Sequence, residues 1–268
     1  MPFTSLRVLP LHAGNPGPMT GSGNWTYLVP GPLPVLIDAG VGAASHLDEI
    51  WRQASGGPAV VAVTHAHSDH ASGAPALAAR APAARFLKHP WPERDQQVPV
   101  SWAPLADGDV IETAEGPLTV VHTPGHSPDH LAFWHAPSRT VFTGDLLVLG
   151  SSVVIPGSGG GSLAAYLASL RRIADLAPLR ALPAHGPVID DPLTLVAQYT
   201  AHRLAREAQV LDALHAGATT PAEIAARVYE RLDPALVTMA HQSVLAHLVK
   251  LEDEGRASHD GAVWRTVR

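Results

Sequence analysis

Hydrophobic positions along the 268-residue chain follow two different patterns. Up to about residue 190, the apolar segments are short and are interrupted by Gly and Pro, which is typical of strands joined by tight turns. Beyond that point, apolar residues recur at helical spacing over long stretches with almost no Gly. We therefore predict a mixed α/β unit over residues 1–190 and a helical unit over residues 191–268.

Strands dominate the prediction for the first unit. The run at 59–63 is apolar on both faces, as expected for a strand buried in a sheet. Helical spacing of apolar residues predicts helices over 72–80 and 162–176. The expected strands are residues 25–29, 35–37, 59–64, 85–87, 118–122, 131–134 and 140–142.

The second unit is predicted to consist of three helices and a hairpin. A long amphipathic helix is expected over 191–216, and another over 234–254. Between them, Thr220 can cap a helix that has Pro221 at its first position, with Glu223 completing a capping box. A hairpin around Asp260 follows, and this order of elements indicates a small winged-helix-like domain.

Composition narrows the chemistry. The chain has no cysteine, which excludes disulfides, thiolate zinc sites, iron–sulfur clusters and a cysteine nucleophile. It has 16 histidines beside 18 Lys and Arg residues. Any transition-metal site must therefore use imidazole and carboxylate ligands.

Charge and hydropathy bear on partners and location. A formal net charge of -6 argues against an obligate nucleic-acid binder, although a local basic groove remains compatible with it. The tail carries only one basic residue, Lys250, on the helix that would enter a major groove, so we expect no sequence-specific DNA binding. No uncharged apolar run approaches the roughly 20 residues of a spanning helix, and we expect a soluble cytoplasmic protein without a membrane partner. The pattern does not indicate an oligomeric state.

The segment Thr64-His65-Ala66-His67-Ser68-Asp69-His70 follows the buried strand directly. In an extended backbone His65 and His67 point the same way, and the following turn can bring Asp69 and His70 close to them. Further candidate ligands, each in a turn after a strand or short apolar segment, are His126, Asp145 and His185. One lone histidine is more often structural than a ligand, but this combination indicates a site for two metals.

These motifs resemble those of the metallo-β-lactamase superfamily over residues 5–190. The resemblance implies an αββα sandwich of the α/β (α+β) class with a two-metal site at one edge of the paired sheets. It implies that His65, His67 and His126 hold the first metal, that Asp69, His70 and His185 hold the second, and that Asp145 bridges them. Zinc is the expected metal for such ligands, with iron or manganese as alternatives.

Departures from the superfamily pattern exclude several branches. Several lactam-hydrolysing subclasses have a cysteine in the second metal site, whereas this chain has Asp145 at the bridging position and no cysteine. This difference argues against antibiotic hydrolysis. The oxygen-reducing di-iron branch has a glutamate where this chain has His67, which disfavours redox chemistry. The short spacing between His126 and Asp145 leaves no room for the insertion of the exonuclease and RNA-processing branch.

A closer resemblance, to the β-lactamase-like protein 2 family, covers nearly the whole chain. It is carried by Asn15-Pro16-Gly17-Pro18-Met19-Thr20, by Asn24-x-x-Tyr27-Leu28-Val29, by Thr123-Pro124-Gly125-His126-Ser127-x-Asp129-His130, and by the tail after Tyr199-x-x-His202-Arg203. The resemblance implies either an endonuclease acting on single-stranded RNA or a thioesterase like those of related fungal enzymes.

The expected mechanism uses a hydroxide shared by the two metals as the nucleophile. Asp145 would set the metal separation, and Asp69 could orient the hydroxide and pass on its proton. His130 is a candidate proton donor or substrate contact, with a supporting role as the alternative. His202 and Arg203 are candidate clamps for an anionic substrate group, with an ordinary helix surface as the alternative.

Three functions follow from the residues and the resemblance. The first is cleavage of single-stranded RNA, and the second is hydrolysis of small esters or thioesters. The third is a non-enzymatic binding module with a vestigial metal site, which the complete ligand set disfavours. Connectivity from His185 into the long helix also predicts that the tail forms one wall of the substrate pocket.

Overall fold

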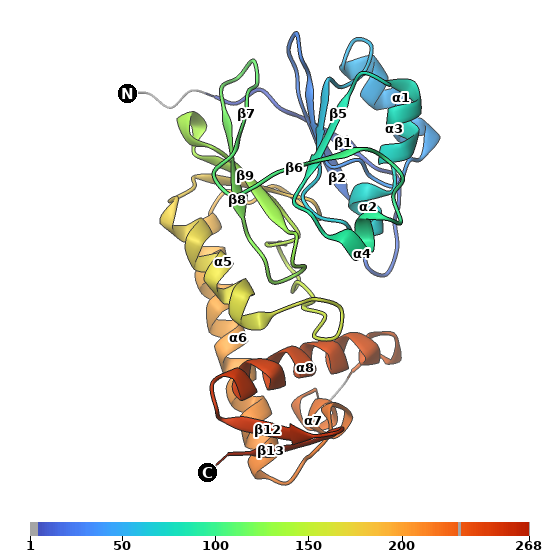
Figure 1. Cartoon of the computed structure of the whole chain (residues 1–268). Helices are drawn as coiled ribbons and strands as arrows, with labels where there is room; N and C mark the ends of the chain where they lie inside the picture. The colour runs from blue at the N-terminus through green and yellow to red at the C-terminus, as the bar shows by residue number, and fades with distance from the viewer. Residues whose placement is uncertain (1–4, 230–231, 268) are drawn as a thin grey trace.

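The structure, a computed structural model, describes residues 5–229 and 232–267. Two β-sheets face each other, and helices cover the outer face of each sheet, so that the larger unit has four layers (Figure 1). A smaller helical unit lies below it and is reached through the long helix α6 (Pro192–His215). The αββα class predicted from the sequence is confirmed.

The first sheet has the strand order β1-β2-β3-β4-β5-β6. Its first three strands pair antiparallel, and pairing from β3 onward is parallel. Parallel strands align their carboxyl ends at one edge of a sheet, which is where ligand residues can gather. The bounds are β1 (Leu9–His12), β2 (Trp25–Val29), β3 (Val35–Ile37), β4 (Val60–Ala62), β5 (Arg85–Lys88) and β6 (Trp102–Pro104).

The second sheet has the order β11-β10-β9-β8-β7 and is antiparallel except for the pair β10 and β11. Residues 131–135 and 140–144 form its central strands and are buried along their whole length. The bounds are β7 (Val110–Ile111), β8 (Leu118–His122), β9 (Leu131–His135), β10 (Thr140–Gly144) and β11 (Arg180–Pro183).

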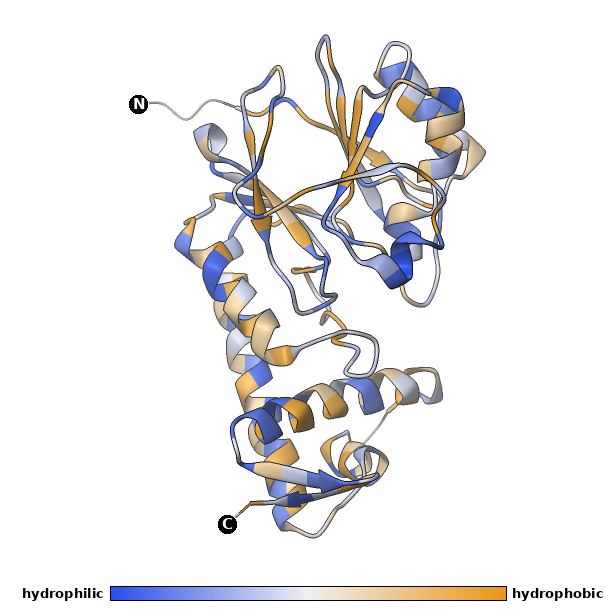
Figure 2. Cartoon of the chain, viewed as in Figure 1, coloured by the Kyte–Doolittle hydropathy of each residue, from blue (hydrophilic) through white to orange (hydrophobic). Residues whose placement is uncertain are grey.

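Each pair of adjacent layers encloses its own apolar core. Figure 2 shows that the strands of both sheets are rich in apolar residues. Phe133 and Phe142 pack against residues of the first sheet between the two sheets. Leu47 and Leu77 fill the space behind the first sheet, and Tyr166 fills the space behind the second. The covering helices are α1 (Ala44–Gln53), α2 (Ser68–Ala71), α3 (Ala74–Arg80), α4 (Pro92–Asp95) and α5 (Leu163–Asp175), with a 3-10 turn at Ala136–Ser138.

The sequence pattern missed the strands β1, β6, β7 and β11 and the helices α1, α2 and α4. These strands have two to four residues, and β1, β6 and β11 contain Pro, so they show no run of alternating apolar positions. Helix α1 places His46, Leu47 and Ile50 on one buried face, a helical spacing that the sequence analysis did not use. These elements form because adjacent strands and packed layers supply the hydrogen bonds and apolar contacts that their own sequences do not indicate.

The C-terminal unit has the predicted three helices and hairpin. Thr220 Oγ1 accepts from the Glu223 N–H, and the Glu223 carboxylate accepts from the Thr220 N–H, which confirms the capping box. Val210, Val244 and Leu248 belong to its core. The elements are the end of α6, α7 (Pro221–Val228), a 3-10 turn (Pro234–Leu236), α8 (Val237–Asp253), β12 (Ala257–Asp260) and β13 (Val263–Thr266).

Helix α6 belongs to both units. Leu195 and Tyr199 pack in the core behind the second sheet, whereas Val210 and Leu214 pack in the core of the C-terminal unit. Because α6 contributes to both cores, the domain boundary expected at residue 190 stays a prediction. Among the described residues, no helix has both the length and the apolar character needed to span a membrane.

His247 on α8 provides a pH-dependent contribution to stability. Its ring is 1% exposed, and neither ring nitrogen has a hydrogen-bond partner among the described residues. Burial is the main cause that lowers the pKa of His247 to about 3, and the cations of Arg203, Arg206 and Lys250 contribute to the same shift. Below about pH 6.5, His247 therefore binds a proton in the unfolded chain but stays neutral in the folded chain. The free energy of unfolding falls as the pH decreases from about 6.5 towards 3.

We expect His247→Leu to remove this pH dependence. Relative to the variant, the parent should lose roughly 1–2 kcal/mol of unfolding free energy between about pH 7 and pH 5, measured by urea titration. His215→Leu, at an exposed position on α6, is the control and should leave the slope unchanged. Parallel pH curves for the parent and His247→Leu would contradict the assignment.

Candidate metal centre

Candidate ligands converge from four places where a strand ends. His65, His67, Asp69 and His70 follow β4, and His126 lies in the turn between β8 and β9. Asp145 follows β10, and His185 follows β11. The turn carrying His126 requires glycine at position 125, because the backbone there has φ +139° and a Cβ would lie 2.4 Å from the Tyr166 backbone nitrogen.

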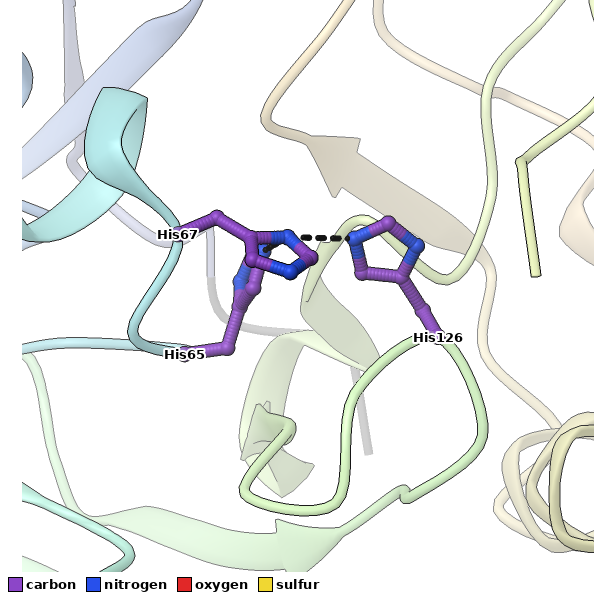
Figure 3. A group of neighbouring side chains, drawn as sticks. All are labelled: His65, His67 and His126. Carbon is purple, nitrogen blue, oxygen red and sulfur yellow. Dashed lines mark hydrogen bonds between the residues drawn. The ribbon is translucent and has the colours of Figure 1, made fainter. Parts of the chain in front are cut away.

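The first ligand group consists of His65, His67 and His126 (Figure 3). His67 Nδ1 lies 2.9 Å from His65 Nε2 and 2.9 Å from His126 Nε2. Figure 3 shows the three rings from two separate loops turned towards one another. Three imidazole nitrogens thus face one small volume.

The second ligand group consists of Asp69, His70 and His185. Asp69 Oδ2 lies 3.4 Å from His70 Nε2 and 3.3 Å from His185 Nε2. The Asn24 amide group donates to the Asp69 backbone oxygen at 2.8 Å, which fixes the turn that presents this carboxylate.

Asp145 lies between the two groups and turns one carboxylate oxygen to each. Its Oδ2 lies 3.5 Å from His126 Nε2 and 4.0 Å from His65 Nε2. Its Oδ1 lies 3.4 Å from His70 Nε2 and 3.2 Å from His185 Nε2. This arrangement suits a carboxylate shared by two cations.

The donor set fits divalent metals. Ligand nitrogens about 2.0–2.1 Å from a tetrahedral zinc lie roughly 3.3 Å apart, which is close to the spacing of the three histidines. His70 Nε2 and Asp145 Oδ1 are buried and have no hydrogen-bond partner among the described residues. A cation bound by both groups would satisfy these atoms.

The two groups differ in their electrostatics. Burial lowers the pKa of His67 to about 3 and that of His65 well below its usual value, so both rings are neutral and have a nitrogen lone pair available. Burial also lowers the pKa of His185, but the nearby carboxylates of Asp145 and Asp69 outweigh it and raise the value to about 9. The carboxylates of the second group therefore attract positive charge, which a divalent cation would supply.

Asp38 supports this centre and was missed by the sequence analysis. It follows β3, and its carboxylate accepts from the Thr64 N–H at 2.7 Å while its Oδ2 lies 2.9 Å from His70 Nδ1. Its backbone has φ 63°, a conformation unusual for a residue other than glycine. The available signal was Asp38-Ala39-Gly40 at the end of a buried apolar strand.

Lys88 and Asp129 form a second support. Lys88 is 1% exposed, and its Nζ lies 3.4 Å from Asp129 Oδ2 and also pairs with Asp95. Asp129 Oδ2 accepts from the Ala66 N–H at 2.8 Å, and Ala66 separates His65 from His67. The buried ion pair therefore holds the backbone that carries two ligands.

The segment 148–158 supports His126 and connects the centre to the C-terminal helices. The Val154 backbone oxygen accepts from His126 Nδ1 at 2.8 Å, which leaves Nε2 directed to the metal centre. Tyr199 Oη donates to the Val148 and Ser151 oxygens. Gln242 on α8 accepts from both the N–H and the hydroxyl of Ser158, at 2.9 and 2.8 Å.

His130 lies behind the metal centre. It is fully buried, its Nδ1 lies 2.8 Å from Thr123 Oγ1, and its Nε2 accepts from the Asp145 N–H at 3.0 Å. Because both ring nitrogens are engaged, His130 has no proton to offer a substrate. This position favours the supporting role named as the alternative in the sequence analysis, in which His130 holds Asp145 in place, over the catalytic role.

Arg203 also takes a role other than the substrate clamp considered from the sequence. Its side chain is 3% exposed, and its guanidinium donates to Ser152 Oγ and the Val153 oxygen. It therefore holds the 151–153 backbone in place. His202 is exposed and lines the groove between the two units, and its role as a substrate clamp stays a prediction.

Two sheets of this topology, with histidine and aspartate ligands gathered at their strand ends, define a metal-dependent hydrolase of the αββα type. Residues 19–185 match the family model of the metallo-beta-lactamase superfamily, and residues 220–264 match the beta-lactamase associated winged helix domain. The chain belongs to the metallo-beta-lactamase superfamily.

Curated and solved proteins resemble this chain over most of its length. An atrochrysone carboxyl ACP thioesterase of Aspergillus novofumigatus is 30% identical over 96% of this chain and 82% of its own length. The beta-lactamase-like protein 2 homolog of Drosophila melanogaster is 30% identical over 90% of this chain and 86% of its own, which confirms the closer resemblance. A solved protein in a di-iron-bound form is 30% identical, covers 72% of this chain and 99% of its own, and superposes with a TM-score of 0.58.

Proposed function

We propose that this hydrolase cleaves acyl thioesters with two divalent metals held at the ligand groups described above. The observation that carries the two-metal part is Asp145, whose two oxygens face different groups of ligands. The thioester part is supported by the 30% identical thioesterase and by the cavity over the site. This cavity of about 290 Å³ is lined by His126, Asp145 and His185 and also by the apolar residues Met19 and Val153.

His65, His67 and His126 would hold one metal, and Asp69, His70 and His185 the other, with Asp145 shared. Bound there, the metals would supply an activated water at neutral pH and polarise the substrate carbonyl. Zinc and iron both accept imidazole and carboxylate ligands, and the di-iron form of the related structure supports iron as much as zinc. We also propose that the protein works in the cytoplasm, as expected from its sequence.

The chain's own residues then have separate tasks. The Asp69 carboxylate, which remains partly exposed, can take the proton from the attacking water and return it to the leaving thiolate. The apolar side chains of Met19, Val148 and Val153 would lie against the acyl side of the bond. Asp38, Asp129 and the Val154 carbonyl fix the ligands and need no contact with substrate.

Cleavage of single-stranded RNA is the second candidate. His202, Arg203 and Arg206 line the groove next to the site and would attract phosphates. The overall charge of -6 opposes this, because extended RNA binding requires many cationic contacts. The two candidates therefore predict different responses to salt.

The test loads purified protein separately with zinc and iron and offers an acyl thioester of N-acetylcysteamine or a single-stranded oligoribonucleotide. We expect thioester turnover that changes little between about 50 and 200 mM salt, because a neutral substrate has no phosphate contacts to lose. Metal removal by a chelator should abolish it, and adding metal back should restore it. RNA cleavage that falls steeply with salt, without thioester turnover, would establish the second candidate instead.

A further inference from the structure

A groove between the two units opens beside the metal centre. It has a volume of about 410 Å³, within the range of ligand sites in proteins. Pro18, Met19 and residues 151–154 form its upper wall, and α6 and α8 form its lower wall. The tail thus forms one wall of this groove, and the expectation that it forms a wall of the substrate pocket stays a prediction.

The groove and the metal cavity share walls. Pro18, Met19 and residues 151–154 line both. His126 and Asp145 lie at the metal end, and Arg206 and Met239 lie at the other. A substrate held at the metals can therefore extend along the 151–154 segment towards the C-terminal helices.

The chemistry of the groove changes along its length. Met19 is 63% exposed and Leu236 is 42% exposed, although both are apolar. Val153 and Met239 add to the same surface. Exposed apolar side chains that face one another across a groove indicate an apolar ligand.

Positive charge lies on α6 at the far end of this apolar surface. His202, Arg203 and Arg206 line the groove, and no carboxylate is among the described residues that line it. Arg203 is occupied by the 151–153 segment, which leaves Arg206 as the guanidinium suited to a ligand. Arg206 is half-buried, lies 4.3 Å from the Tyr229 ring centroid, and makes one hydrogen bond in the described part of the chain, to the Val228 oxygen.

The contacts of Arg206 fix it without neutralising it. Stacking on Tyr229 and the bond to a neutral carbonyl restrict its rotamers, so little side-chain entropy remains to be lost when it binds an anion. A guanidinium has five N–H donors and binds carboxylates in a bidentate manner.

We propose that this groove binds the acyl part of the substrate and that it prefers an apolar chain or ring whose far end carries a carboxylate bound by Arg206. The inference rests on the proposed thioesterase function and adds a substrate class to it. The thioester carbonyl lies at the metal centre, the apolar body lies along Met19 and Val153, and the anionic end lies at Arg206.

The test compares two N-acetylcysteamine thioesters of equal chain length, hexanoyl and adipoyl, the latter with a free terminal carboxylate. In metal-loaded protein, the adipoyl thioester should have a KM about 10-fold lower, as expected for one charge-assisted contact. Calorimetry with metal-free protein should show the same preference in Kd without hydrolysis. A series of thioesters that all end in a free carboxylate, with acyl chains of four to ten carbons, would locate the chain length that reaches Arg206.

Arg206→Gln should raise the adipoyl KM and Kd about 10-fold and leave the hexanoyl values unchanged, because glutamine can still donate to the Val228 oxygen. Met239→Trp should weaken both thioesters by filling the groove. Arg85→Gln removes an exposed arginine at the start of β5, outside the groove, and is the charge-matched control that should change nothing. Unchanged melting curves would show that each variant is folded.

Equal binding of the two thioesters by the parent, or no effect of Arg206→Gln, would overturn the acyl-carboxylate assignment. If metal-loaded protein hydrolyses neither thioester, the proposed function fails, whereas calorimetry still reports whether the groove binds them. Arg206-dependent binding of a single-stranded oligoribonucleotide, with no binding of either thioester, would assign the groove to nucleic acid.

Discussion

The Asp145→Asn variant is expected to bind fewer than two metal ions per chain and to lose at least about 1,000-fold in hydrolytic rate. Asn keeps the shape of the side chain but removes the charge and one acceptor oxygen. In the parent, Oδ2 faces the His65–His126 side and Oδ1 faces the His70–His185 side, so one substitution affects both groups. A loss of about 1,000-fold in rate corresponds to losing several kcal/mol of the transition-state stabilisation that the metals supply.

Elemental analysis of protein dialysed after metal loading, combined with steady-state kinetics, measures both effects. Asp190→Asn is the matched control, because Asp190 is 90% exposed and lies 4.0 Å from Arg180 on the surface. It should retain two metals and full turnover. Two tightly bound metals and unchanged turnover in Asp145→Asn would exclude Asp145 as the shared ligand.

The second large effect is on stability and concerns Lys88→Met. Methionine has a similar length but leaves the Asp129 carboxylate, which is fully buried, without its cation. Burial already raises the pKa of Asp129, and Lys88 opposes that shift, so removing Lys88 leaves a costly buried charge. We expect a loss of about 3–5 kcal/mol of unfolding free energy and weaker metal binding through the Ala66 backbone.

Chemical denaturation of the parent and variant measures this loss. Arg80→Met removes an exposed ion pair with Asp48 and serves as the control, with an expected cost below about 1 kcal/mol. The double variant Lys88→Met/Asp129→Asn should recover part of the stability, because the unpaired charge is gone. A cost for Lys88→Met no larger than that for Arg80→Met would show that the buried pair contributes little.

Features fixed by neighbouring residues could be predicted from the sequence. The buried strand before His65, the capping box at Thr220 and the hairpin at Asp260 each depend on a few adjacent positions. The candidate ligands could be found because each follows a strand or apolar segment in a Gly- or Pro-containing context. The local patterns predicted a mixed α/β unit followed by a helical unit, and the resemblance carried by the ligand motifs implied the αββα class.

Features that depend on distant partners could not be predicted in this way. Lys88 and Asp129 are separated by 41 positions, and neither stands out without its partner. The supporting role of Asp38 could be predicted only by knowing that β3 and β4 lie side by side. His130 and Arg203 were recognised as notable, but only packing shows that His130 faces Asp145 from behind and that Arg203 faces the 151–153 backbone.

The Val154 carbonyl has a consequence for the order in which the protein assembles during synthesis. A nascent chain that ends before Tyr199 already contains all the candidate ligands. It lacks Tyr199, Arg203 and Gln242, which hold the segment that orients His126. We therefore expect the growing chain to form its two sheets first and to acquire a correctly oriented His126 only after α8 has left the ribosome.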